Sequence, residues 1–113
     1  MKPHKIILSD STLDNIRDIS HKHLDLVGKN SSQSIRNKLY SSISLLADNP
    51  FMGRLHENPL LSELGIRYIV CGVYLCFYFI TDEKVRLICI ADGRKNYLYL
   101  VLKAYKKLLE EPV

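Results

Sequence analysis

Basic and aromatic side chains gather at two places in the second half of this 113-residue sequence. Arg67 lies in a strand-like run and shares its expected face with Ile69 and Cys71, an unusual neighbourhood for a cation. Arg94 and Lys95 follow another such run and come just before Tyr97. A guanidinium binds phosphate through two parallel hydrogen bonds, and a tyrosine ring can stack on a nucleobase. These residue types are therefore suited to a phosphate-bearing partner.

Each of these residues also has a structural explanation. Arg67 can be an inward-facing arginine that pairs with a carboxylate such as Asp92 or with strand carbonyls, because an unpaired buried charge is strongly disfavoured. Arg94 and Lys95 can belong to a solvated turn, and Tyr97 can be an amphipathic core residue. The sequence leaves both explanations open.

Proton carriers are scarcer than cations. Asp92, at the end of a strand-like run, can act as a base, but its ordinary pKa of about 3.9 suits that task only if burial raises it. His56 lies beside Arg54 in an irregular stretch, where a histidine is ordinarily exposed and without a role. Lys103 belongs to a basic turn near the end of the last predicted helix, where it complements the helix dipole or contacts an anion.

Composition predicts one ordinary globular domain that spans residues 1–113. Hydrophobic residues make up 47% of the chain and charged residues 25%. Sixteen Lys and Arg against twelve Asp and Glu give a net charge of +4, which is compatible with a polyanionic or acidic partner. No apolar run is long enough for a signal peptide or a membrane span, so we expect a cytoplasmic protein without a membrane partner.

Three cysteines, Cys71, Cys76 and Cys89, lie among strand-like apolar residues. Their number is odd, and no Cys-x-x-Cys pair or matching histidine pair accompanies them. We therefore expect reduced, buried thiols, with no metal and no cofactor.

Periodicity and turn signals divide the chain into alternating helices and strands. Ser9 to Ser11 supply N-cap candidates for a first helix that ends at Gly28, and Asn49-Pro50 closes a second. Residues 51–64 are predicted as a loop with a possible helical turn. The remaining elements are a strand over residues 4–8, three antiparallel strands over 66–71, 74–80 and 85–91, and a last helix over about 96–110. The fold class is α+β, in the order β-α-α-β-β-β-α, with a helical hairpin and a C-terminal helix on an antiparallel sheet.

Four short motifs, read in this order, resemble the RelE/ParE superfamily of toxins from type II toxin–antitoxin modules. They are Asn49-Pro50-Phe51-Met52-Gly53-Arg54, Gly65-Ile66-Arg67-Tyr68, Tyr74-Leu75-Cys76-Phe77-Tyr78 and Ile90-Ala91-Asp92-Gly93-Arg94-Lys95-Asn96-Tyr97. The predicted element order is similar to the compact fold of that superfamily. The resemblance covers residues from about 5 to 109.

The resemblance implies one of two activities. RelE-like toxins are ribosome-dependent endoribonucleases that cleave mRNA and so arrest translation, whereas ParE-like toxins bind DNA gyrase without catalysis of their own. The nuclease branch resembles this chain in a phosphate-binding arginine at Arg67 and in basic residues at Arg94 and Lys95. With Tyr97 and Asp92 as candidates for proton transfer, these are the predicted catalytic residues. Many members carry a histidine at the position of Asp92.

The leading hypothesis is an mRNA endonuclease that inhibits growth, with Arg54, His56 and Lys103 as further nucleic-acid contacts and the ribosome and mRNA as partners. The alternative is a gyrase inhibitor, and a third is a non-catalytic basic binding module. Under both toxin hypotheses the resemblance implies a cognate antitoxin that wraps the toxin in an oligomeric complex.

Overall fold

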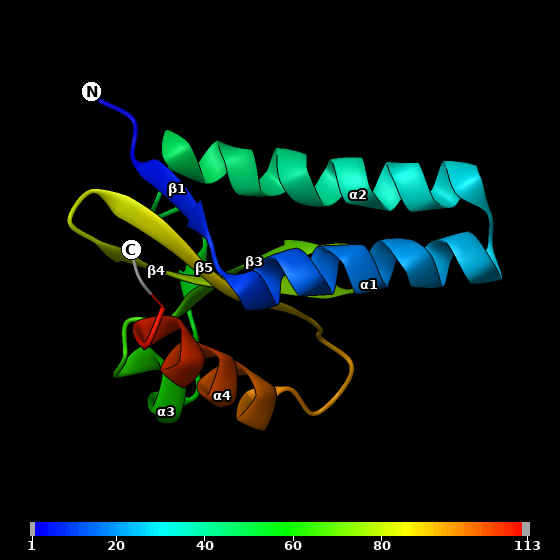
Figure 1. The fold of residues 1–113 in the computed structure, drawn as a ribbon. Coiled ribbons are helices and arrows are strands. Elements are labelled where there is room, and N and C mark those ends of the chain that lie inside the picture. The colour runs from blue at the N-terminus through cyan, green and yellow to red at the C-terminus, as the bar shows by residue number, and fades with distance from the viewer. Residues whose placement is uncertain (1, 112–113) are drawn as a thin grey trace.

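The computed structural model describes residues 2–111, and it contains a five-stranded sheet with helices on both faces (Figure 1). The strands are β1 (Lys5–Leu8), β2 (Arg54–Leu55), β3 (Arg67–Cys71), β4 (Tyr74–Thr81) and β5 (Lys84–Asp92). The helices are α1 (Asp10–Leu26), α2 (Lys29–Ser44), α3 (Pro59–Ser62) and α4 (Leu98–Leu109), with a 3-10 turn, η1 (Leu45–Ala47), after α2. The predicted α+β class and the helical hairpin are confirmed.

The start of α1 is capped as predicted. The Ser9 hydroxyl accepts a hydrogen bond from the backbone N–H of Thr12 at 3.0 Å, which satisfies one of the free donors of the first turn. The same hydroxyl donates to the Ile88 carbonyl at 2.8 Å. Ser9 therefore joins the helical hairpin to the sheet as well as starting the helix.

The sheet is mixed, and this corrects the predicted antiparallel sheet. Its strand order is β1-β5-β4-β3-β2, and β1 runs parallel to β5, with Leu8 opposite Leu87. The other neighbours are antiparallel. Alternation of apolar residues predicts a strand but says nothing about its neighbour, so the partner of β1 was not visible in the sequence.

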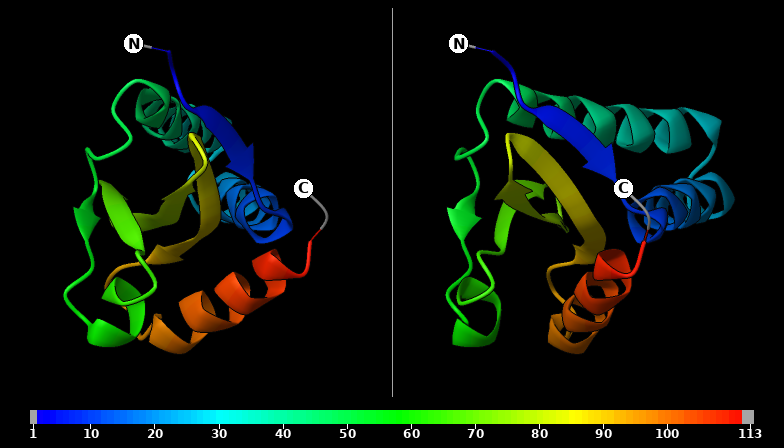
Figure 2. Two further views of the ribbon diagram at one scale, coloured as in Figure 1. Left: turned by 90° about the vertical axis from the view of Figure 1, so that its left-hand side faces the viewer. Right: turned by 60° about the vertical axis from the view of Figure 1, so that its left-hand side comes forward.

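Helices α1 and α2 lie on one side of the sheet and α4 lies on the other (Figure 2). Two hydrophobic clusters cover the two faces of the sheet, on either side of β4. Tyr78 and Cys76 pack toward the hairpin, with Leu39 of α2, while Phe77 packs toward α4, with Val101. The central strand is therefore buried on both faces, as its near-continuous run of apolar residues requires. Within residues 2–111, no helix combines the length and apolar character needed to cross a bilayer.

The stretch 51–64, predicted as a loop, also contains the short edge strand β2 and the single turn α3. Asn58 caps α3 by accepting from the Leu60 N–H at 2.9 Å, and Pro59 occupies its first position. β2 has two residues, which is too short for a periodic signal.

Candidate functional site

Arg67 and Tyr78 together hold the 50–53 loop against the sheet. The Arg67 guanidinium donates to the Gly53 carbonyl at 2.9 Å, and its Cζ lies 5.0 Å from the centre of the Phe51 ring. The Tyr78 hydroxyl donates to the Pro50 carbonyl at 2.7 Å and accepts from the Gly53 N–H at 2.9 Å. We call this arrangement the loop clamp. In the loop clamp, the half-buried Arg67 cation is bound by a backbone carbonyl and an aromatic ring and not by a carboxylate.

The pairing of Arg67 with Asp92, one of the expected structural explanations, is wrong. Arg67 lies opposite Tyr78, whereas Asp92 lies opposite Tyr74, which is four residues earlier in β4. At about 3.3 Å per strand residue, the backbone positions of Arg67 and Asp92 lie about 13 Å apart along the strand direction alone. The partner of Arg67 is a loop carbonyl, because the loop approaches the sheet where β3 begins.

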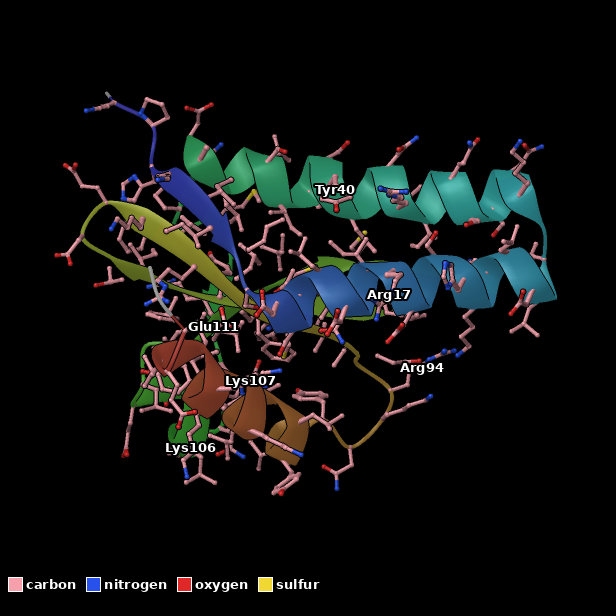
Figure 3. The ribbon with its side chains drawn as sticks, in the orientation of Figure 1. Arg17, Tyr40, Arg94, Lys106, Lys107 and Glu111 are labelled. Atoms are coloured by element: carbon pink, nitrogen blue, oxygen red, sulfur yellow. The ribbon has the colours of Figure 1, made fainter. Side chains whose placement is uncertain are left out.

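Asp92 and Arg94 form a two-pronged ion pair at the junction between β5 and α4, and Arg94 lies on the connecting loop (Figure 3). The Asp92 Oδ1 accepts from Arg94 Nε at 3.0 Å and from the Arg94 backbone N–H at 2.9 Å, and Oδ2 accepts from Nη2 at 2.8 Å. These hydrogen bonds to Arg94 hold the pKa of Asp92 well below its usual range. Asp92 is therefore a poor general base.

The Asp92–Arg94 ion pair should make the free energy of unfolding depend on pH. Since the pKa of Asp92 is lower in the folded chain than in the unfolded chain, its contribution is complete above the ordinary aspartate pKa of about 3.9. The contribution is lost as the pH falls toward the folded value. We expect the stability difference between wild type and Asp92→Asn to be constant from neutral pH down to about pH 5 and to shrink below about pH 4. Urea unfolding at several pH values measures this; a difference that grows on acidification would contradict it.

His56 is buried, with 7% of its side chain exposed, so the expectation of an exposed loop histidine is wrong. Its Nδ1 accepts from the Asn58 N–H at 3.0 Å, which places the ring proton on Nε2. Nε2 lies 2.8 Å from the Tyr97 hydroxyl and donates to it. The ring packs against Tyr68, Phe77 and Tyr97. The acceptor nitrogen of the His56 ring is therefore already engaged by the backbone.

Arg54 lies at the edge of this aromatic group. Its guanidinium is 3.6 Å from Glu57 Oε1 and 5.9 Å from the centre of the Tyr68 ring. The Tyr68 hydroxyl donates to the same Glu57 oxygen at 2.8 Å, and this hydrogen bond lowers the pKa of Glu57. Burial raises the pKa of Tyr97, so this phenol keeps its proton at neutral pH.

The predicted site residues divide between the two faces of the sheet. Arg67 shares the hairpin face with Ile69, whereas Tyr97 packs on the α4 face against Phe77. Asp92, Lys95 and Tyr97 line one hollow of about 260 Å³, and Lys103 lines the adjoining hollow of about 250 Å³. Arg67, Arg54 and His56 line neither. The structure thus gathers the junction residues and separates Arg67 from them.

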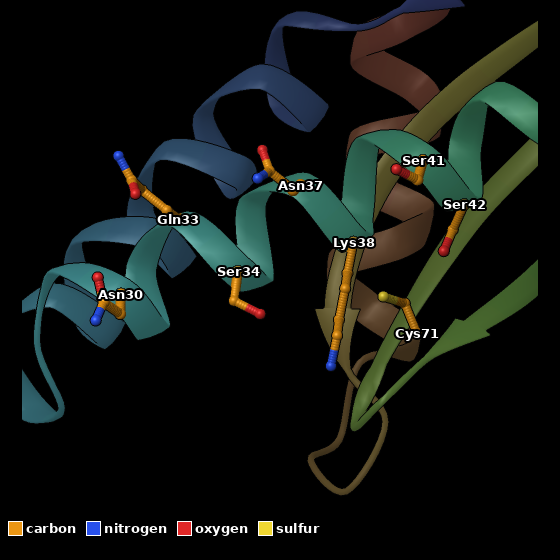
Figure 4. A pocket seen from close by; sticks show the side chains of 8 residues that line it. All are labelled: Asn30, Gln33, Ser34, Asn37, Lys38, Ser41, Ser42 and Cys71. Atoms are coloured by element: carbon orange, nitrogen blue, oxygen red, sulfur yellow. The ribbon is translucent and has the colours of Figure 1, made fainter.

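A wider hollow of about 600 Å³ lies between α2 and β3 (Figure 4). None of the predicted site residues lines this hollow. Its lining consists of Cys71 and of polar side chains from α2, which are Asn30, Gln33, Ser34, Asn37, Lys38, Ser41 and Ser42. No cluster of three or more His, Cys, Asp or Glu side chains within the described residues could hold a metal ion.

The three cysteines are free and buried, as predicted. Burial raises the pKa of Cys76 and of Cys89 to about 12, so their reactive thiolate forms are rare at neutral pH. We expect a thiol reagent to label both residues only on unfolding. Mass spectrometry of the labelled native and urea-unfolded chain measures this, and rapid native labelling of Cys76 would contradict it.

Sequence reasoning missed the role of Tyr78 and Gly53 in the loop clamp. Both residues belong to the motifs that carried the family resemblance, yet they lie 25 residues apart along the chain. The motifs could have drawn attention to Gly53 and Tyr78, but only the fold shows that these two residues contact each other.

A family model for the ParE toxin of type II toxin–antitoxin systems matches residues 6–97. The fold is similar to a chain of the chromosomal ParDE toxin–antitoxin system from P. aeruginosa, with a TM-score of 0.68 and 13% identity over 79% of this chain and 95% of that chain. It is also similar to a chain of the RelBE2 toxin–antitoxin complex from Mycobacterium tuberculosis, with a TM-score of 0.54 and 16% identity over 80% and 98% of the two chains. No curated protein matches by sequence. The chain belongs to the ParE toxin family of type II toxin–antitoxin systems.

Proposed function

We propose that this toxin inhibits DNA gyrase by binding it and does not cleave RNA itself. The observation that carries the proposal is the state of the two candidate proton carriers. His56 Nδ1 is occupied by the Asn58 N–H, and both Asp92 oxygens are occupied by Arg94. Attack by an RNA 2′-hydroxyl needs a base that can take its proton, and neither group is free to do so. The gyrase target is the one that resemblance to ParE-like toxins implies.

The cations support the same proposal. RNA cleavage needs positive groups that converge on the extra charge of the transition state. Arg67 is held by the Gly53 carbonyl on one face of the sheet, Tyr97 packs on the other, and Arg94 is neutralised by Asp92. A protein that acts by binding needs no such convergence.

We propose a cognate antitoxin as the second partner, in an oligomeric toxin–antitoxin complex. Support comes from the family and from the ParDE and RelBE2 toxin–antitoxin systems, each of which contains a chain of similar fold. The proposed gyrase target implies a cytoplasmic location. Expression of the chain alone should arrest growth, and co-expression with the antitoxin should restore it.

A ribosome-dependent endoribonuclease is the second candidate. It is favoured by the position of Asp92, Lys95 and Tyr97 around one hollow at the junction. Its catalysis would require the Asp92–Arg94 pair to open when RNA binds.

The test is to add the purified chain to two assays in parallel. In the first, gyrase supercoils a relaxed plasmid; in the second, ribosomes translate an mRNA whose ends are mapped by primer extension. We expect loss of supercoiling and intact mRNA, with heat-denatured chain as the control. Cut mRNA together with normal supercoiling would overturn the proposal, and loss of the cuts in Arg94→Ala would then assign the activity to the junction.

A further inference from the structure

Helix α4 and the loop before it carry an unusual share of the chain's positive charge. Residues 93–109 contain five of the sixteen Lys and Arg residues and none of the twelve Asp and Glu residues. The basic and acidic residues elsewhere in the chain nearly cancel. The net charge of +4 therefore comes from this one segment.

Three of these cations form an exposed surface, which we call the basic face of α4. Its residues are Lys103, Lys106 and Lys107, and all three are exposed. α4 packs on the sheet through its buried residues Val101 and Leu108. At 3.6 residues per turn, the three lysines lie on the side of the helix that faces away from the sheet. Figure 3 shows Lys106 and Lys107 on α4.

The helix itself accounts for only part of this charge. Lys106 and Lys107 lie in the last turn of α4, where cations complement the partial negative charge of a helix C-terminus. Lys103 lies more than one turn before Leu109, the last residue of α4, and the effect of the helix dipole falls off within the last turn. No ion pair within residues 2–111 includes any of the three lysines. The basic face can therefore bind an anionic partner without breaking an existing pair.

The spacing of these side chains suits a linear array of negative charge. Lys103 and Lys107 are four residues apart, so they lie on one side of α4 and about 6 Å apart along its axis. Tyr99 lies one turn nearer the start of the helix, and it is 72% exposed. Lysine and tyrosine side chains both donate hydrogen bonds to DNA phosphates. The exposed side of α4 thus presents a row of phosphate-binding groups.

We propose that the basic face of α4 binds the phosphates of duplex DNA while the toxin is bound to gyrase. Gyrase holds the duplex that it supercoils, and a duplex is a dense array of negative charge. This inference rests on the gyrase target proposed above and adds the DNA as a second contact. The contact does not depend on DNA sequence, because bonds to phosphates carry no sequence information. It weakens as salt rises, because binding releases counterions from the DNA.

The test measures the affinity of fluorescently labelled toxin for purified gyrase, with and without a bound duplex, at several salt concentrations. Fluorescence anisotropy reports the binding. We expect the duplex to strengthen binding of the wild-type toxin about tenfold at low salt. We call this strengthening the DNA gain.

Two double variants remove the same amount of charge from different places. Lys103→Gln/Lys107→Gln changes the basic face, whereas Lys29→Gln/Lys38→Gln changes two exposed lysines of α2, on the other side of the sheet. In the first variant the DNA gain should fall toward onefold. The slope of log affinity against log salt in the presence of the duplex should become shallower by about two. The α2 variant should match the wild type in both measurements.

A conservative variant and a folding control complete the design. Lys103→Arg/Lys107→Arg keeps both charges, so it should retain the DNA gain. Loss of the gain in this variant would contradict a contact that depends on charge. Circular dichroism and thermal melts verify that all the variants are folded.

The outcomes distinguish the DNA contact from the gyrase target. If the wild type binds gyrase equally well with and without the duplex, the DNA contact is wrong and the gyrase target stands. If Lys103→Gln/Lys107→Gln loses as much affinity without the duplex as with it, the basic face contacts gyrase itself, and the DNA contact is again wrong. An equal loss in the α2 variant would show that only net charge matters, which also overturns the contact. If the wild type does not bind gyrase in either state, the gyrase target fails and the DNA contact fails with it.

Discussion

Replacing Gly53 by alanine is expected to lower the free energy of unfolding by about 3 kcal/mol, the upper end of the usual range for an overpacked site. A Cβ at this position would lie 2.6 Å from the Tyr78 hydroxyl oxygen and 2.7 Å from the Tyr68 carbonyl oxygen. The second atom belongs to the backbone of β3 and cannot move without disturbing the sheet. The loop must then lift, which breaks its hydrogen bonds to Tyr78 and Arg67. Urea unfolding followed by circular dichroism measures the loss.

Gly72→Ala is the matched control, because a Cβ there meets no atom within 4 Å. Gly72 has φ +61°, so alanine at this site suffers only the backbone strain of a left-handed residue, about 1 kcal/mol. If Gly53→Ala is no less stable than Gly72→Ala, the close approach of the loop to the sheet is contradicted.

The four longer strands, the helical hairpin and the last helix were predictable because their signals are local. The near-continuous apolar run of β4 is typical of a strand that is buried on both faces, and Ser9 indicated the start of α1. The partner of β1 and the edge strand β2 were not predictable. Strand alternation does not encode the neighbour of a strand, and two residues carry no period.

The candidate site was predictable as a set of residues but not as an arrangement. Asp92, Lys95 and Tyr97 are close in sequence and meet at one hollow. His56 was expected to be exposed because its own neighbours form a loop. It is buried by Tyr68, Phe77 and Tyr97, which come from distant parts of the chain. Arg67 was singled out because a cation is unusual on that strand face, but its partner is a backbone carbonyl, and no residue type signals that.

Arg67→Ala is the variant that distinguishes a structural arginine from a catalytic one. It removes a charged hydrogen bond to the Gly53 carbonyl and the stacking on Phe51. We expect a loss of about 2 kcal/mol in the free energy of unfolding, the usual range for a hydrogen bond to a charged group. Arg67→Lys keeps the charge but cannot stack in the same way, so it should recover only part of the loss.

Arg54→Ala serves as the control, because Arg54 is exposed and its removal should change stability by about 0.5 kcal/mol or less. At a temperature where Arg67→Ala remains folded, it should inhibit gyrase in proportion to its folded fraction, because the loop clamp acts through structure. Wild-type stability in Arg67→Ala would contradict the clamp. If that stable variant had also lost toxicity, Arg67 would contact the target directly, and RNA cleavage would become the better explanation because it needs such a cation at the phosphate.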